Sequence, residues 1–173
     1  WQLHYCHRAF IYPFQLQIRA GSTTPLRMTL FGAIVTSACG YLNGEFISRY
    51  AAHLQTTDWF YSPAFILGTI LFVIGYILNK ASDSELIKLR KYNPDNYSIP
   101  YKGAYRWVSC PNYLGELITW FGFSLAAWSI AGFTFALMSA ANLTVRALEN
   151  HQWYHAKFPD YPPERKAIIP FML

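Results

Sequence analysis

The chain has 173 residues, of which 53% are hydrophobic, 18% aromatic and only 13% charged. A soluble domain of this size usually buries less apolar surface, so the composition favours a membrane protein. The mean hydropathy of +0.13 excludes a chain that is apolar throughout, because the charges are gathered into a few segments. The net charge of +5 does not indicate nucleic-acid binding, since a largely embedded chain leaves little room for an exposed basic surface.

Three apolar stretches in the first half predict helices. Residues 1–16 are expected to be the end of a helix in which Arg8 is the only permanent charge. Residues 26–46 form the second candidate, which is interrupted by glycines of the kind that membrane helices tolerate. Residues 61–79 form the third, where Pro63 suits the first helical turn. Each of these stretches is a predicted membrane crossing.

The longest uncharged run covers residues 117–145 and predicts two further crossings. It has 29 residues, and the apolar turns before it, from about Trp107, supply enough chain for two helices of about 20 residues each. The small residues at 129–132 predict the tight turn of a helical hairpin. The fold class is therefore all-α, a polytopic membrane bundle of about five helices in one domain, residues 1–173. The three cysteines, Cys6, Cys39 and Cys110, are expected to be buried free thiols.

The basic residues predict the orientation of this bundle. Five crossings place residues 17–28, 80–106 and 146–173 on one side of the membrane, and of the 14 basic residues only Arg8 and Arg49 lie outside these segments. Positive charge in short loops marks the cytosolic face. We therefore expect an integral membrane protein with cytosolic basic loops and C-terminus, in the endoplasmic reticulum of a eukaryote or the inner membrane of a bacterium.

Polar residues repeat at helical spacing in two places before the hairpin. Asn79, Asp83 and Arg90 fall on one helix face, although solvated groups at a helix end would show the same spacing. Asn112 and Glu116 also share a face, and no cation stands near Glu116 in the sequence. An acidic side chain within a membrane segment is a candidate functional residue.

A third polar face lies on the last helix, where Arg146, Asn150 and Tyr154 repeat every four residues. If the three faces converge, they form an arginine-bearing cavity that suits a phosphorylated ligand, because arginine binds phosphate through two parallel hydrogen bonds. The sequence has no glycine-rich nucleotide loop, so the helices and loops themselves would have to build such a site.

The histidine pairs His4 and His7, and His151 and His155, have spacings that would allow a metal ion to bind on one helix face. The chain lacks the larger set of histidine and carboxylate repeats that a membrane di-iron enzyme uses. We therefore expect no metal site.

Motifs along the whole chain resemble the steroid 5-alpha-reductase family. Residues 4–8, HYCHR, are similar to the family's HYxHR motif, and residues 79–90 to its N-x-x-S-D-x-x-L-x-x-L-R segment. Residues 108–116 resemble its VSxxNxxGE signature, and residues 153–171 its WYxxKFxDYPxxRKAIIPF ending.

The resemblance implies a seven-helix reductase whose first two helices, together with a second donor glutamate, precede Trp1. It also implies that NADPH lies between the helices and that a steroid or lipid enone receives hydride at its β carbon. By motif, Tyr5 would hydrogen-bond the substrate carbonyl. The residues that would hold the cofactor are Asn79, Asp83, Arg90, Asn112, Glu116, Arg146 and Tyr154.

Two other functions remain open from the sequence. One is a trans-2-enoyl-CoA reductase of fatty-acid elongation, which residues 108–113 (VSCPNY) would also suit. The other is an inactive relative that serves as a structural subunit of a membrane complex, with other subunits as partners. The partners expected of the enzyme are the enone substrate and membrane lipids.

Overall fold

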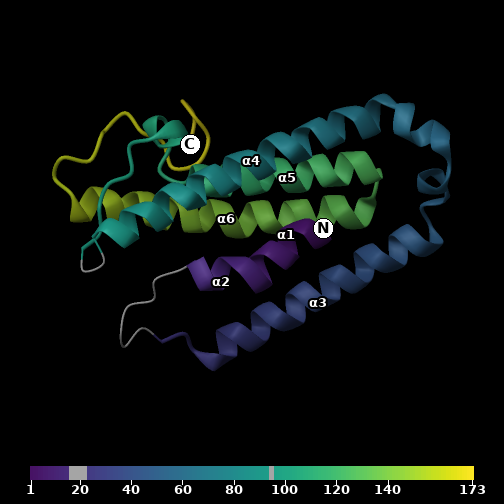
Figure 1. The fold of residues 1–173 in the computed structure, drawn as a ribbon, viewed down its shortest axis with the longest axis horizontal. Helices are drawn as coiled ribbons and strands as arrows, with labels where there is room; N and C mark the ends of the chain where they lie inside the picture. Colours follow the sequence, from purple (N-terminus) through teal and green to yellow (C-terminus); the bar gives the residue numbers. More distant parts are fainter. Residues whose placement is uncertain (16–22, 94–95) are drawn as a thin grey trace.

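The computed structural model describes residues 1–15, 23–93 and 96–173, and these residues form helices and no β-strand, which confirms the all-α class (Figure 1). The long helices are α3 (Leu26–Arg49), α4 (Pro63–Tyr92), α5 (Pro111–Ala127) and α6 (Ile130–Lys157). The short ones are α1 (Gln2–Cys6), the π-helix η1 (His7–Ile11), α2 (Tyr12–Gln15) and the 3₁₀ turns η2 (Ala52–Gln55), η3 (Thr57–Tyr61) and η4 (Gly103–Arg106). Part of the basic segment expected at 17–28, including Arg19, lies outside the described residues.

Two of the described helices, α4 and α6, are long and apolar enough to cross a bilayer, which is fewer than the five crossings expected. α5 has 17 residues and is therefore about 25 Å long, short of the roughly 30 Å of a hydrocarbon core. α3 has 24 residues but is not one of the two candidates, and Asn43 and Glu45 lie in its second half. The five helical segments exist, but length and hydropathy alone identify only two of them as candidate spans.

Local chemistry explains where the long helices begin and end. α4 begins with Pro63 after Ser62, whose hydroxyl accepts a hydrogen bond from the Phe65 amide at 3.2 Å. The turn of the α5–α6 hairpin is tighter than predicted, since it consists of Trp128 and Ser129 only. Trp128 adopts the left-handed conformation (φ 46°), which reverses the chain. Gly132, expected in the turn, lies inside α6, where a Cβ would approach Ser124 Cα to 3.2 Å.

α4 and α5 pack through four glycines that bring their backbones into contact. A Cβ atom on Gly68 or Gly75 of α4 would lie 2.3 or 2.5 Å from a backbone nitrogen of α5. A Cβ on Gly115 or Gly122 of α5 would lie 2.5 or 2.4 Å from a backbone nitrogen of α4. Because glycine has no side chain, the two backbones can come close enough to gain extensive van der Waals contact.

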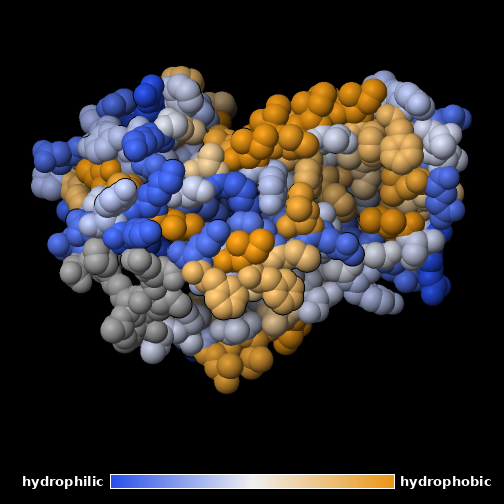
Figure 2. Space-filling view, viewed as in Figure 1, coloured by the Kyte–Doolittle hydropathy of each residue, from blue (hydrophilic) through white to orange (hydrophobic). Residues whose placement is uncertain are grey.

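The C-terminal segment is tied to the loop before α5 at the polar end of the bundle. The Ser109 amide donates to the Lys166 carbonyl at 2.8 Å, and the Lys166 amide donates to the Trp107 carbonyl at 3.0 Å. Figure 2 shows polar side chains gathered at this end and apolar ones along α4. The exposed apolar side chains of α4 include Ile70 (49% exposed) and Ile77 (61%), so this face is not covered by the described chain.

All three cysteines are free thiols, as expected. Cys39 and Cys110 are buried, but Cys6 is exposed, so the expectation of burial was wrong for this residue. Cys6 is the last residue of α1.

The glycine seam predicts a position-specific loss of stability. We expect Gly75→Ala to destabilise the protein by about 1–3 kcal/mol, because the new methyl group would overlap backbone atoms of α5. Gly32→Ala is the matched control, since no heavy atom lies within 4 Å of that site and alanine forms helices better than glycine by about 1 kcal/mol. Thermal unfolding of the purified protein in detergent measures both changes. Equal midpoints would contradict the seam.

Candidate active site

The predicted polar faces meet around one cavity of about 720 Å³. Six of the eight predicted site residues line it: Tyr5, Arg90, Asn112, Glu116, Arg146 and Tyr154. The backbone contact of α4 and α5 sets the α4 and α5 faces against each other, and α6 returns along α5 to supply the third face. The helical spacings in the sequence therefore identified five of these six lining residues, whereas Tyr5 came from the family motif.

The other two predicted residues, Asn79 and Asp83, do not line the cavity but stand behind it. Both are buried, with exposed fractions of 0% and 3%. Asn79 Nδ2 donates to the Asn112 carbonyl at 2.9 Å, and Asn112 Nδ2 donates to Asp83 Oδ1 at 3.2 Å. These two side chains fix the position of Asn112, which does face the cavity.

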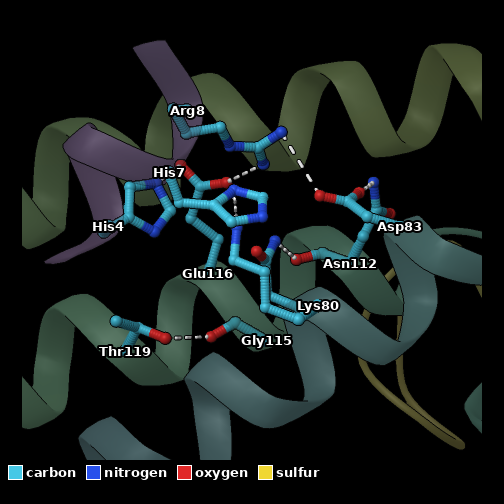
Figure 3. Close-up of polar contacts among 10 residues, drawn as sticks. His4, His7, Arg8, Lys80, Asp83, Asn112, Gly115, Glu116 and Thr119 are labelled. Atoms are coloured by element: carbon cyan, nitrogen blue, oxygen red, sulfur yellow. Dashed lines mark hydrogen bonds and ion pairs between the residues drawn. The ribbon is translucent and has the colours of Figure 1, made fainter. Parts of the chain in front are cut away.

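Arg8 is the central cation of the site, and spacing did not single it out. Its guanidinium lies 3.3 Å from Asp83 Oδ2 on α4 and 3.0 Å from Glu116 Oε2 on α5 (Figure 3). Glu116 thus has a compensating cation, although the sequence shows none nearby, because Arg8 is 108 residues away in the chain. The only signal was its membership of the HYCHR motif.

Two further contacts hold the N-terminal helices on the bundle, and sequence reasoning missed both. Lys80 Nζ lies 3.1 Å from His7 Nδ1, and His4 Nε2 lies 3.8 Å from Glu116 Oε1 (Figure 3). Every one of these partners comes from a different helix, so no periodicity within one helix could have paired them.

Aromatic packing fixes the Tyr5 side chain. Its ring stacks on Trp120 of α5 with centroids 5.8 Å apart, and Trp1 lies against both rings at 4.9 Å from Tyr5 and 5.2 Å from Trp120. Such offset and tilted pairs are favourable beyond simple burial. The phenol is therefore held in place beside Glu116 and the cavity.

Two arginines at the cavity remain without a partner among the described residues. Arg90 and Arg146 are exposed, and neither forms an ion pair with any described side chain. Arg8, by contrast, is already neutralised by two carboxylates. The cavity therefore offers two uncompensated guanidinium groups to an anionic ligand.

Ser109, which precedes α5 and lines the cavity, connects the last helix with the C-terminal segment. The Ser109 hydroxyl lies 2.6 Å from His151 Nδ1 and 2.7 Å from the Tyr161 hydroxyl, so it joins α6 to the tail. Nearby, the Tyr105 hydroxyl donates to the Ser82 carbonyl at 3.3 Å, and burial raises the pKa of this phenol, which keeps it a donor.

The Arg8 contacts predict a large effect on stability. We expect Arg8→Met to destabilise the fold by about 3–5 kcal/mol, because the buried Asp83 and the partly buried Glu116 would lose their cation. Arg49→Met is the control, since its pair with Glu45 is exposed and such pairs contribute about 1 kcal/mol or less. Adding Glu116→Gln to Arg8→Met should recover part of the loss in a thermal unfolding assay. No recovery would show that the uncompensated charge is not the cause.

Comparison with known proteins gives a consistent assignment. The sequence pattern described as 3-oxo-5-alpha-steroid 4-dehydrogenase matches residues 22–173. The chain is 40% identical over 171 residues to 3-oxo-5-alpha-steroid 4-dehydrogenase 1 of Bos taurus, covering 99% of this chain and 65% of that protein. It is 38% identical over 175 residues to steroid 5-alpha-reductase DET2 of Arabidopsis thaliana, covering 98% of this chain and 66% of that protein. The chain thus spans slightly less than two thirds of the length of these relatives, and it belongs to the 3-oxo-5-alpha-steroid 4-dehydrogenase family.

Proposed function

We propose that this chain carries the cofactor site and one catalytic donor of an enzyme that reduces the C=C bond of a 3-oxo-Δ4 steroid or a similar lipid enone with NADPH. The observation that carries the proposal is the position of Tyr5. Its phenol lies at a cavity that also presents two unpaired arginines. The relatives named above are steroid dehydrogenases or reductases, which supports the same chemistry.

The cavity suits a phosphorylated dinucleotide in both size and charge. Its volume of about 720 Å³ falls within the usual range for ligand sites, about 300–1,000 Å³. Arg90 and Arg146 would bind phosphate groups, because guanidinium binds phosphate through two parallel hydrogen bonds. Tyr154, which is also in the wall, offers a ring face and a hydroxyl.

The acidic residues would have a different role from the arginines. Asp83 and Glu116 are both compensated by Arg8, and Glu116, which lines the cavity, can accept hydrogen bonds from hydroxyl or amide groups of the cofactor. Glu116 and Asn112 line the cavity and would contact the cofactor directly. Asp83 and Asn79 would act through Asn112, which both of them contact.

Tyr5 would supply the electrophilic assistance that reduction of an enone requires. Its hydroxyl donates a hydrogen bond to the substrate carbonyl oxygen, which stabilises the negative charge that develops there. Bound NADPH would supply the hydride that the β carbon receives. The α carbon takes its proton from the phenol or from water, which completes the addition of two hydrogens across the double bond.

We also propose that the chain is a multi-pass membrane protein with all five helical segments in the bilayer. The exposed apolar side chains of α4 support this proposal, because a core helix of a soluble protein would bury them. α5 is too short to cross alone but pairs closely with α4. The concentration of basic residues at the polar end favours a cytosolic opening of the cavity, where NADPH is available.

The decisive experiment measures NADPH consumption by the complete protein in detergent with progesterone, testosterone and a trans-2-enoyl-CoA. Turnover of the steroids supports the proposal. Turnover of the thioester alone would identify a fatty-acid elongation enzyme instead. If none of the three substrates causes NADPH consumption, the result contradicts the reductase and favours a structural subunit.

The role of Tyr5 gives a prediction about rate. We expect Tyr5→Phe to lower kcat by about 10²-fold or more while leaving NADPH affinity nearly unchanged, because the ring still packs on Trp120 but the donor is gone. Tyr41→Phe is the control, since Tyr41 is 68% exposed on α3 and does not line the cavity. Steady-state kinetics compares the two variants. Unchanged kcat in Tyr5→Phe would remove Tyr5 from the mechanism.

The unpaired arginines give a prediction about cofactor affinity. We expect Arg90→Gln and Arg146→Gln each to weaken NADPH binding by about tenfold, because each loses a charge-assisted hydrogen bond. The loss should shrink at high salt. Arg106→Gln is the control, since Arg106 does not line the cavity. Titration of NADPH by fluorescence measures all three. If Arg106→Gln weakens binding as much as the others, the phosphates do not bind at Arg90 and Arg146.

A further inference from the structure

His4 is buried and faces the cavity, and one of its ring nitrogens has no partner. Only 2% of the residue is exposed, and it is one of the cavity-lining residues. Its Nδ1 forms no hydrogen bond with any described residue. A buried polar atom without a partner costs about 1–3 kcal/mol, so such an atom in a side chain that lines a ligand cavity indicates a missing partner.

The other ring nitrogen indicates which hydrogen-bonding role Nδ1 has. Nε2 faces the Glu116 carboxylate at 3.8 Å, beyond hydrogen-bonding distance, and the negative charge on that side favours the tautomer with the proton on Nε2. In that neutral tautomer Nδ1 carries the lone pair and accepts a hydrogen bond. The group that completes the site must therefore be a donor, an N–H or an O–H.

The surroundings of His4 determine which part of a ligand can reach it. The His4 ring packs edge-on against Trp120 at 4.8 Å and against the catalytic Tyr5 ring at 5.4 Å. A ligand group at Nδ1 therefore lies close to the phenol, where the reacting parts of substrate and cofactor must meet. An enone carbonyl is an acceptor and cannot satisfy Nδ1. The nicotinamide carboxamide, in contrast, carries an N–H₂ group.

We propose that His4 binds the carboxamide N–H of the nicotinamide ring through Nδ1 and thereby orients that ring beside Tyr5. This inference rests on the proposed function, since it requires a nicotinamide cofactor. It assigns His4 a ligand contact in addition to its contact with Glu116.

Two substitutions distinguish the roles of the two nitrogens of the His4 ring. In His4→Asn the side-chain amide occupies the place of Nδ1, whereas in His4→Gln it occupies the place of Nε2. We expect His4→Asn to keep NADPH affinity within about threefold and His4→Gln to weaken it about tenfold, as expected for one lost hydrogen bond. If His4 acted only through its contact with Glu116, His4→Asn would weaken NADPH binding more than His4→Gln. His7→Gln is the matched control, because His7 lies one turn later, contacts Lys80 and does not line the cavity.

A cofactor analogue tests the proposed partner atom directly. Reduced 3-acetylpyridine adenine dinucleotide phosphate has a methyl group in place of the carboxamide N–H₂ group. Binding is measured by fluorescence titration in the absence of substrate, so that no turnover is needed. The wild-type protein should bind the analogue about tenfold more weakly than NADPH, and His4→Gln should bind the two about equally.

The outcomes distinguish this inference from the proposed function. If His4→Gln discriminates between the two cofactors as strongly as the wild type, the carboxamide does not bind at His4, although the reductase proposal stands. If the wild type discriminates between the two cofactors, His4→Gln does not, and the wild type reduces no enone, the His4 contact holds and the proposed reaction fails. If the wild type does not bind NADPH, both proposals are wrong.

Discussion

The backbone contact between α4 and α5 is the constraint on which the rest of the structure depends. Four glycines allow the two helices to approach until an added Cβ would overlap the opposite backbone. Only at this separation can Asn79 of α4 reach the Asn112 carbonyl of α5, and Asn112 reach Asp83 in return. The glycines thus pack the two helices together, and the hydrogen bonds that support the cavity wall form one helical turn further along. A wider separation would leave the Asn79 amide buried without its acceptor and would remove from Asp83 the hydrogen bond of Asn112.

Charge compensation is the second layer built on that seam. Asp83 and Glu116 come from different helices, and Arg8 from a third contacts both (Figure 3). Because Tyr5 lies on the same short helical segment as Arg8, the arginine anchors the phenol as well as neutralising the carboxylates. Within the part of the chain that the structure describes, Arg90 and Arg146 are then the cavity-lining arginines without an ion pair. A site that contains two acids can therefore still suit the anionic cofactor that we propose.

The sequence predicted the features that depend on neighbours along one helix. Charge-free runs identified the helices, Ser62 and Pro63 marked the start of α4, and four-residue repeats identified the cavity faces. The partners of Arg8 and His4 could not be predicted, because they depend on how separate helices pack. The assignment of Asn79 and Asp83 to the cavity surface was imprecise for the same reason. Periodicity gives the direction in which a side chain points from its helix, but not whether another residue separates it from the cavity. The predicted position of the hairpin turn was wrong because Gly132 lies in α6 and packs against Ser124. A glycine in a turn and a glycine at a helix contact look the same in the sequence.

Arg8 has a further consequence for how this sequence can change over evolutionary time. One guanidinium links positions 83 and 116 and holds the segment that carries Tyr5, so the three charged positions form one unit. Loss of either acid would leave the arginine partly uncompensated, and loss of the arginine would leave two acids uncompensated. Viable sequences should therefore change these positions together, and the positions should covary among homologues although they are far apart in the chain. The residues of the glycine seam should instead be restricted one by one, since each meets backbone that no compensating side chain can replace.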